Sequence, residues 1–368
     1  MPMHVWKRDV LTSLSRLGLS ARLPVGAQIR VIDFALRSGH TPPPTDAMHR
    51  ELSDVFGRWG GYDEARAGQL AAEHSATMYR AGLLWYLLRI TPSDQIEGYL
   101  DRRVRVEGVE RLERASAKGP VVLFSGHYGL PVTAVIAAAR ALHGRSTVNT
   151  FFAPPEENPS TAGFAEVFAA APYGIQSIQV SPRAPIAALR ALRAGQVLTM
   201  QPDVYDNRNG SAVVIPFLDG LTYAMTGTAY LALRASATLI PVFAVVDERG
   251  GVTVTFDDPL AFTRQGDNDV DGYRLTCAMY ECIERKIRER PDQWVYWQVL
   301  AERMIPITAL HKDRRTDPGA WQEAYENARQ WASQAVPELR ELPFVWQDRT
   351  TARESTSPTT DVTSTVGV

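Results

Sequence analysis

The sequence predicts an α/β fold with a mostly parallel central sheet flanked by helices and a helical N-terminal region. From residue 104 onward, short apolar runs alternate with segments of helical periodicity, the pattern of parallel strands joined by crossover helices. Residues 1–100 show helical spacing interrupted only by turns. Apolar residues make up 45% of the 368 residues and charged residues 22%, so the chain can bury a sizeable core.

Helices and turns account for the N-terminal region. Residues 35–46, ALRSGHTPPPTD, predict a loop, because consecutive prolines exclude a helix. We expect Asp46 to cap the following helix, which Gly60 and Gly61 end. Residues 63–90 form the next predicted helix, since apolar side chains recur there every three or four positions.

Strands and helices alternate in the region that follows. A strand beginning at residue 104 opens it, and the further strands expected are 121–124, 146–153, 196–203, 211–218, 238–246 and 252–260. The helices expected are a short one between the first two strands, then 133–142, 161–171, 181–195, 225–236, 275–297 with a stop at Pro291, and 319–336.

Composition divides the chain into four parts. We expect a helical region at 1–100 packed on an α/β core at 101–303, and then a helical segment at 304–346. The Ser/Thr-rich end, 347–368, has too few large apolar residues to pack and is predicted to be disordered.

Several classes of protein are disfavoured by composition. The net charge of −2 gives no basic excess for nucleic acid. No apolar run is long enough for a transmembrane span, and no signal peptide is evident, which predicts a cytoplasmic protein. The run AGLLWYLL, 81–88, is expected to pack in the core, with peripheral membrane contact as the alternative. We expect Cys277 and Cys282 to be reduced core thiols. Neither a metal nor a nucleotide motif occurs, so no cofactor is predicted.

His127 is the histidine whose surroundings point to chemistry. It follows the apolar run VVLF and lies on a turn between Gly126 and Gly129, which permit tight turns and close approach of a substrate. An imidazole there can accept a proton near neutral pH, although a hydrogen-bonded structural histidine is the alternative. A histidine base usually has an orienting carboxylate, yet the next acidic residue along the chain is Glu156.

Four segments together resemble the bacterial lipid A late acyltransferases and the phosphatidylinositol mannoside acyltransferases, within the lysophospholipid acyltransferase-like superfamily. They span about residues 100–303 and read VEGVERLERASAKGPVVLFSGHYG, FFAPPEENP, the long block from RALRAGQVLTMQPD to ATLIPVF, and IRERPDQWVYWQ. The resemblance implies a glycerolipid acyltransferase-like fold. It also implies a histidine that deprotonates an acceptor attacking an acyl thioester, oriented by an acid that four intervening residues separate from it. Here Val132 occupies the acid's position, and Leu130-Pro131 replaces the family's Asn-Trp pair.

Another acid must therefore orient His127 if the acyl transfer is kept. Asp203 ends the strand expected at 196–203 and matches an acidic position in the family's second block. Because ligands bind at the carboxyl ends of parallel strands, Asp203 could face His127, bind a cationic substrate, or simply cap a turn. Glu156 and Glu157, after the strand at 146–153, are the other candidates and could also hold an amine.

Four further residues are candidates for substrate binding. Asp206 and Arg208 lie on the loop after Asp203, where the guanidinium could bind a phosphate or carboxylate, unless this is a solvated turn. Ser125 is a candidate polar contact, and Tyr128 could donate from its hydroxyl, although a packed aromatic is the default for Tyr128.

These observations predict a soluble acyltransferase-like enzyme of specialised metabolism with His127 and Asp203 as catalytic residues. Its co-substrate would be an acyl-CoA or an acyl or aminoacyl carrier protein, and its acceptor an amine or a hydroxyl. One alternative is a repurposed member that catalyses an intramolecular substitution or cyclisation on a carrier-tethered intermediate. A second alternative is a non-catalytic binding subunit, and a small partner subunit is compatible with each interpretation.

Overall fold

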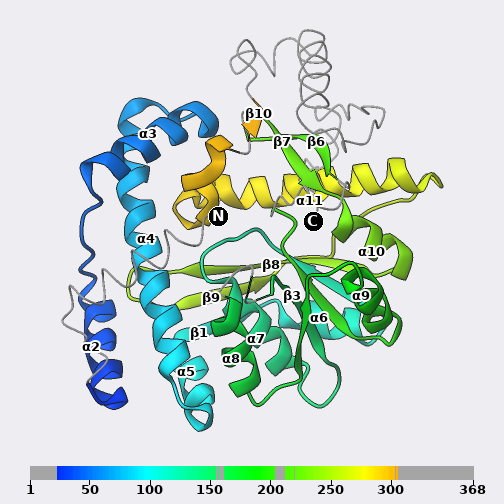
Figure 1. The fold of residues 1–368 in the computed structure, drawn as a ribbon, viewed down its shortest axis with the longest axis horizontal. Coiled ribbons are helices and arrows are strands. Elements are labelled where there is room, and N and C mark those ends of the chain that lie inside the picture. Colours follow the sequence, from blue (N-terminus) through cyan, green and yellow to red (C-terminus); the bar gives the residue numbers. More distant parts are fainter. Residues whose placement is uncertain are drawn as a thin grey trace, which may run out of the picture.

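A seven-stranded sheet forms the centre of the fold (Figure 1). The computed structural model describes residues 23–154, 156, 161–203, 212–218, 220–302 and 304–305. Five strands run parallel in the order β8 Thr238–Val246, β2 Val121–Phe124, β5 Val197–Met200, β3 Val148–Phe152 and β4 Ile175–Gln179. At the β8 edge, β9 Val252–Phe256 pairs antiparallel with β8, and β1 Val104–Glu107 pairs parallel with β9. The predicted mostly parallel α/β sheet is thereby confirmed.

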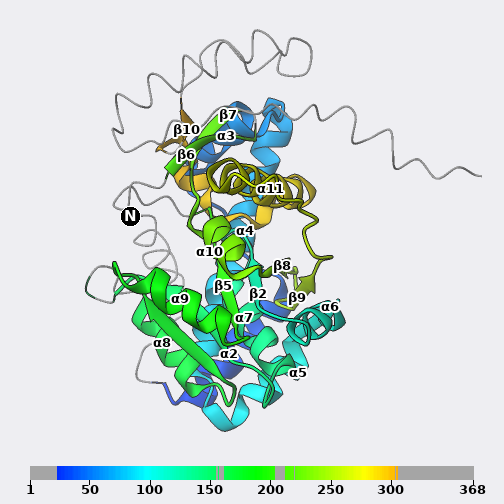
Figure 2. The ribbon, with the colours of Figure 1, turned by 90° about the vertical axis from the view of Figure 1, so that its right-hand side faces the viewer.

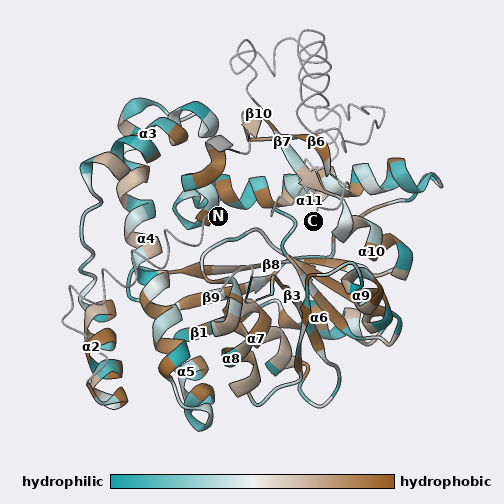
Figure 3. Ribbon diagram, in the orientation of Figure 1, coloured by the Kyte–Doolittle hydropathy of each residue, from teal (hydrophilic) through white to brown (hydrophobic). Residues whose placement is uncertain are grey.

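Successive side chains of the sheet enter two separate apolar clusters. In β2, Val121 and Leu123 belong to one cluster, while Val122 and Phe124 belong to the other, as the period of two in a strand requires. Strands β8 and β9 are accordingly hydrophobic along much of their length (Figure 3). One face is covered by α5 Ile96–Arg103, α6 Val109–Ser116, α7 Pro131–Ala141 and α8 Thr161–Ala170. The other is covered by α9 Ala184–Arg193, α10 Gly227–Ala235 and α11 Asn268–Glu289.

The N-terminal helices are α2 Val25–Ser38, α3 Asp46–Gly60 and α4 Glu64–Ile90. The expected cap of α3 is wrong by one residue: Thr45 accepts the Met48 N–H at 3.3 Å, and Asp46 is already the first helical residue. The longest of them, α4, contributes to both apolar clusters and runs past the sheet edge (Figure 1). Most of its run 81–88 is buried, as expected for core packing. Within the described residues, no helix combines the length and apolarity needed to cross a bilayer.

A second, three-stranded sheet lies on the far side of α11 from the central sheet (Figure 2). It consists of β6 Ala212–Phe217, β7 Gly220–Met225 and β10 Met304–Ile305. The sequence predicted β6 but missed β7, whose apolar residues run directly into the helical pattern of α10. It also missed β4, an edge strand in which Gln176, Ser177 and Gln179 are exposed.

The chain after α11 turns sharply. This helix ends at Glu289, before Pro291, as predicted, and two short 3₁₀ segments follow, Pro291–Gln293 and Val295–Glu302. A short 3₁₀ turn, Ser93–Gln95, also precedes α5. The helix expected at 319–336 and the tail at 347–368 lie outside the described residues. The division of the chain at residue 100 stays a prediction.

Candidate active site

The pairing of β2 with β5 brings His127 and Asp203 together. The strands are parallel neighbours, and Phe124 is the register partner of Met200. The Ser125 N–H extends the pairing by donating to the Met200 carbonyl at 3.1 Å. His127 and Asp203 are each the third residue beyond that last pair, so both leave the sheet at the same edge and at the same height.

Among the residues that the structure describes, His127 and Trp294 donate hydrogen bonds to Asp203. Its Oδ1 lies 2.8 Å from His127 Nδ1, and its Oδ2 accepts the His127 backbone N–H at 2.7 Å. The indole Nε1–H of Trp294 donates to the same Oδ2 at 3.0 Å. The Asp203 side chain is only 1% exposed, whereas that of His127 is 24% exposed. The carboxylate is therefore fixed inside the protein, and the imidazole lies between it and solvent with Nε2 as the nitrogen that does not face Asp203.

The environment of Asp203 favours its ionised form. Burial alone would raise the pKa of this carboxyl group. The attraction of a charged His127, the hydrogen bonds from the His127 ring and Trp294, and that from the His127 N–H outweigh burial and hold the pKa below its ordinary value of 3.8. At neutral pH, Asp203 is thus an anion that orients the imidazole and stabilises its protonated form.

Both glycines of the GHYG turn lie close against other parts of the protein. A Cβ at Gly126 would lie 3.1 Å from Asp203 Oδ2, so the missing side chain leaves room for the carboxylate. Gly129 has a φ of +58°, and a Cβ there would lie 1.8 Å from the Ala244 carbonyl oxygen of β8. The sequence suggested that these glycines admit a substrate; the structure shows that they let the turn close on Asp203 and β8.

The segment from Pro291 to Tyr296 holds the His127 turn from its other side. The Gln293 carbonyl accepts the Gly129 N–H at 2.7 Å, and the Val295 N–H donates to the His127 carbonyl at 2.8 Å. The Tyr296 ring lies against the imidazole, with centroids 4.5 Å apart. The structure thus adds Trp294 and Tyr296 to the site, and neither was a site candidate from the sequence.

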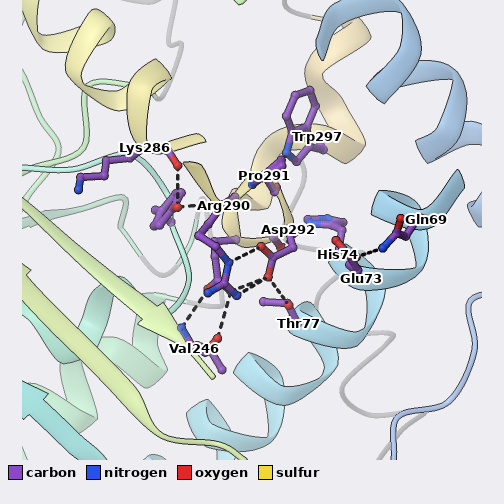
Figure 4. A network of polar contacts seen from close by, with 12 residues as sticks. Gln69, Glu73, His74, Thr77, Val246, Lys286, Arg290, Pro291, Asp292 and Trp297 are labelled. Atoms are coloured by element: carbon purple, nitrogen blue, oxygen red, sulfur yellow. Dashed lines mark hydrogen bonds and ion pairs between the residues drawn. The ribbon is translucent and has the colours of Figure 1, made fainter. Parts of the chain in front are cut away.

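A polar network joins the segment from Pro291 to Tyr296 to α4 (Figure 4). Asp292 accepts hydrogen bonds from Thr77 of α4 and from Arg290 and Gln293, at 2.6–3.1 Å. Gln293 also bonds both the N–H and the carbonyl of Val246, at the end of β8. The N-terminal helical region and the central sheet therefore both fix the segment that contacts His127.

Val132 has a packing role in the fold. It is the second residue of α7 and only 3% exposed, and it belongs to the apolar cluster that also holds Leu130 and Ile136. The position that holds the family's acid is therefore part of the core, and the carboxylate beside His127 comes from the loop after β5 instead.

Ser125 and Tyr128 both use their hydroxyls within the fold. Ser125 is buried, and its Oγ donates to the Gly126 carbonyl at 2.5 Å. Tyr128 is 1% exposed, and its hydroxyl reaches the carbonyls of Lys286 at 2.7 Å and Arg290 at 3.2 Å. Tyr128 is therefore a packed aromatic, the default interpretation of the sequence. Its burial raises the pKa of its hydroxyl.

The remaining candidates lie apart from the pair or outside the described residues. Glu156 is exposed and follows β3, and the described contacts of His127 do not include it. Glu157, Asp206 and Arg208 lie outside the described residues, so their placement stays a prediction. Among the described residues, no group of three or more His, Cys, Asp or Glu side chains could hold a metal ion.

Comparison with known proteins identifies the family of the chain. No curated protein matches the chain. The family model of the bacterial lipid A biosynthesis acyltransferases matches residues 44–300, which include α3, α4, the central sheet and the segment that holds Trp294. That match covers well over half of the 368 residues and includes both members of the histidine–aspartate pair. The chain belongs to the bacterial lipid A biosynthesis acyltransferase family.

Proposed function

We propose that this acyltransferase moves an acyl group from a CoA or carrier-protein thioester to an amine or hydroxyl acceptor, with His127 as the general base. The observation that carries the proposal is the 2.8 Å hydrogen bond between His127 Nδ1 and the buried Asp203 Oδ1. It directs Nε2 away from the carboxylate, toward an acceptor. The proposal places the enzyme in the cytoplasm, with a carrier protein as a candidate partner.

The reaction needs one proton to move twice. Nε2 of His127 takes the proton from the acceptor O–H or N–H as the acceptor attacks the thioester carbonyl carbon. A new C–O or C–N bond forms, the C–S bond breaks, and the leaving thiolate takes the proton back from the imidazolium. Asp203 stays ionised throughout, which its lowered pKa supports, and it stabilises the charged imidazole formed in the first step.

The structure bears on the alternative in which loss of the family's acid changes the chemistry. That alternative rested on Val132, which cannot accept a hydrogen bond. Because Asp203 is hydrogen-bonded to the imidazole, the absence of an acid at position 132 does not by itself require another reaction. Ordinary acyl transfer is therefore the first activity to test, and cyclisation on a carrier-bound substrate the second.

The test measures release of the thiol and transfer of the acyl chain. Purified protein is given palmitoyl-CoA or a palmitoyl carrier protein with panels of hydroxyl and amine acceptors. Free thiol is followed with a chromogenic disulfide, and acylated acceptor by mass spectrometry. We expect thiol release that depends on an acceptor and yields its acylated form in equal amount.

Two variants link that activity to the site. His127→Asn can still donate to Asp203 but has no basic nitrogen, so transfer should fall at least about 100-fold, within the range of general base catalysis. Asp203→Asn should lower transfer at least about tenfold, because it removes the charge that stabilises the imidazolium. The matched control is His143→Asn, at an exposed histidine of the same fold. Full activity in both site variants would contradict the proposal.

A further inference from the structure

Trp294 is a buried core residue that also contacts the catalytic pair directly. Its ring packs edge-to-face against Phe217, Tyr296 and Trp297, as expected for a core aromatic. The only polar group of the indole, Nε1–H, however, donates to Asp203 Oδ2 at 3.0 Å. That oxygen also accepts the His127 backbone N–H, so Oδ2 is occupied while Oδ1 faces the imidazole.

The backbone around Trp294 shows that this contact belongs to a fixed frame. Tyr128 and Trp294 form an isolated antiparallel bridge, which places the indole directly beside the His127 turn. The neighbouring backbone groups bond the same turn: Gln293 O receives the Gly129 N–H, and Val295 N–H reaches His127 O. The backbone of Trp294 is therefore held beside the His127 turn, and its indole is held by the aromatic rings packed against it.

We propose that Trp294 is a positioning residue for the His127–Asp203 pair, its indole N–H fixing the carboxylate and withdrawing part of its charge. The inference rests on the proposed function only for its effect on catalysis; its effect on the imidazole needs no substrate. An N–H donor on Oδ2 prevents rotation of the carboxylate, so that Oδ1 stays on the His127 Nδ1–H. The donor also withdraws part of the negative charge of the Asp203 carboxylate, which would otherwise stabilise the imidazolium form of His127.

Trp297 provides a matched control within the same segment. It is also fully buried, and its Nε1–H also makes one hydrogen bond, to the Pro291 carbonyl at 2.7 Å. Trp294→Phe and Trp297→Phe each remove one indole and one buried N–H donor. The variants differ in which acceptor is left, Asp203 in the first and a backbone carbonyl in the second.

The experiment is an NMR titration of the His127 imidazole in protein labelled with ¹⁵N-histidine, with His127→Asn used to assign the signal. Removing the donor leaves more charge on Asp203, so Trp294→Phe should raise the pKa of His127 by about half a unit or more. Trp297→Phe should leave it unchanged. Where the thioester assay shows activity, the acidic limb of the pH–rate profile of Trp294→Phe should shift to higher pH by the same amount.

A second measurement on the unmutated protein covers the case in which Trp294→Phe does not fold. The ¹⁵N-indole signal of Trp294 should shift with pH in step with the titration of His127, while that of Trp297 stays constant. An indole signal of Trp294 that ignores this titration, or a His127 pKa that moves equally in both variants, overturns the inference. Absence of acyl transfer with the expected NMR result would count against the proposed function alone.

Discussion

Replacing His74 with asparagine should remove much of the pH dependence of folding between pH 4 and pH 6.5. His74 lies in α4 with its side chain fully buried, and its Nδ1 donates to the Asp292 carbonyl at 3.0 Å. Its Nε2 is buried without a hydrogen-bond partner among the described residues. Protonation would place a charge and an unpaired N–H there, and burial accordingly lowers the pKa of His74 from 6.5 to about 4.

The magnitude and the sign follow from that difference. The unfolded chain binds the proton near pH 6.5, while the folded chain resists it down to about pH 4. Above pH 6.5 His74 is neutral in the folded and the unfolded chain, so the folded protein has its full stability. As the pH falls from 6.5 toward 4, protonation of the unfolded chain lowers the free energy of unfolding. At about 1.4 kcal/mol per pH unit, the loss amounts to about 3 kcal/mol of unfolding free energy. Asp203 and Asp292, whose pKa values lie below 3.8, lose their contributions only at lower pH.

The assay is urea unfolding followed by tryptophan fluorescence at pH steps from 7 to 4. Asparagine keeps an N–H donor near the position of Nδ1 but has no group that titrates in this range. The free energy of unfolding of the His74→Asn variant should therefore depend less on pH. The substitution should also lower that free energy at pH 7. His40→Asn, at an exposed histidine, is the control. Parallel curves for the wild type and His74→Asn between pH 4 and 6.5 would refute the reasoning.

Three substitutions test the frame around the site. Gly126→Ala would place a methyl group 3.1 Å from Asp203 Oδ2, so we expect a lower kcat with little change in KM, measured in the thioester assay. Gly129→Ala combines a φ of +58° with a clash against the Ala244 carbonyl, and should cost about 2 kcal/mol or more in urea unfolding. Val132→Glu would bury an unpaired charge, so it should lower stability by about 3 kcal/mol or more and bring no gain in transfer. Increased transfer by this last variant would show that position 132 can still orient the histidine.

Strand order is what the sequence could not supply about the site. The strands β2, β5 and β3 were each predicted, because each is an apolar run bounded by turns. Their neighbours in the sheet were not, so Asp203 and Glu156 remained alternatives for orienting His127. In the structure, β5 lies next to β2, while β3 lies one strand further away. Since neighbouring strands are about 4.8 Å apart, of these two acids only Asp203 follows a direct neighbour of the strand that carries His127.

Contacts between distant segments account for the other differences. Trp294 reaches the site through an isolated bridge to Tyr128, more than 160 residues away in sequence, and no local periodicity encodes such a bridge. Strand β4 was missed because an exposed edge strand lacks the apolar content that marks a central one. The role of Gly126 was misjudged because the atom it makes room for belongs to Asp203, on another strand's loop.

The common register of β2 and β5 has a consequence for how such enzymes are recognised in genomes. A motif that requires an acid separated from the histidine by four residues would not recognise the pair in this chain. Two parallel neighbouring strands, each followed at its third residue by one member of the pair, define the site without that spacing. The imidazole therefore has a carboxylate partner without an acid in the first turn of α7. A diagnostic pattern for this branch would pair the GHYG turn with the acid of the QPD segment, and ignore the residue that Val132 represents.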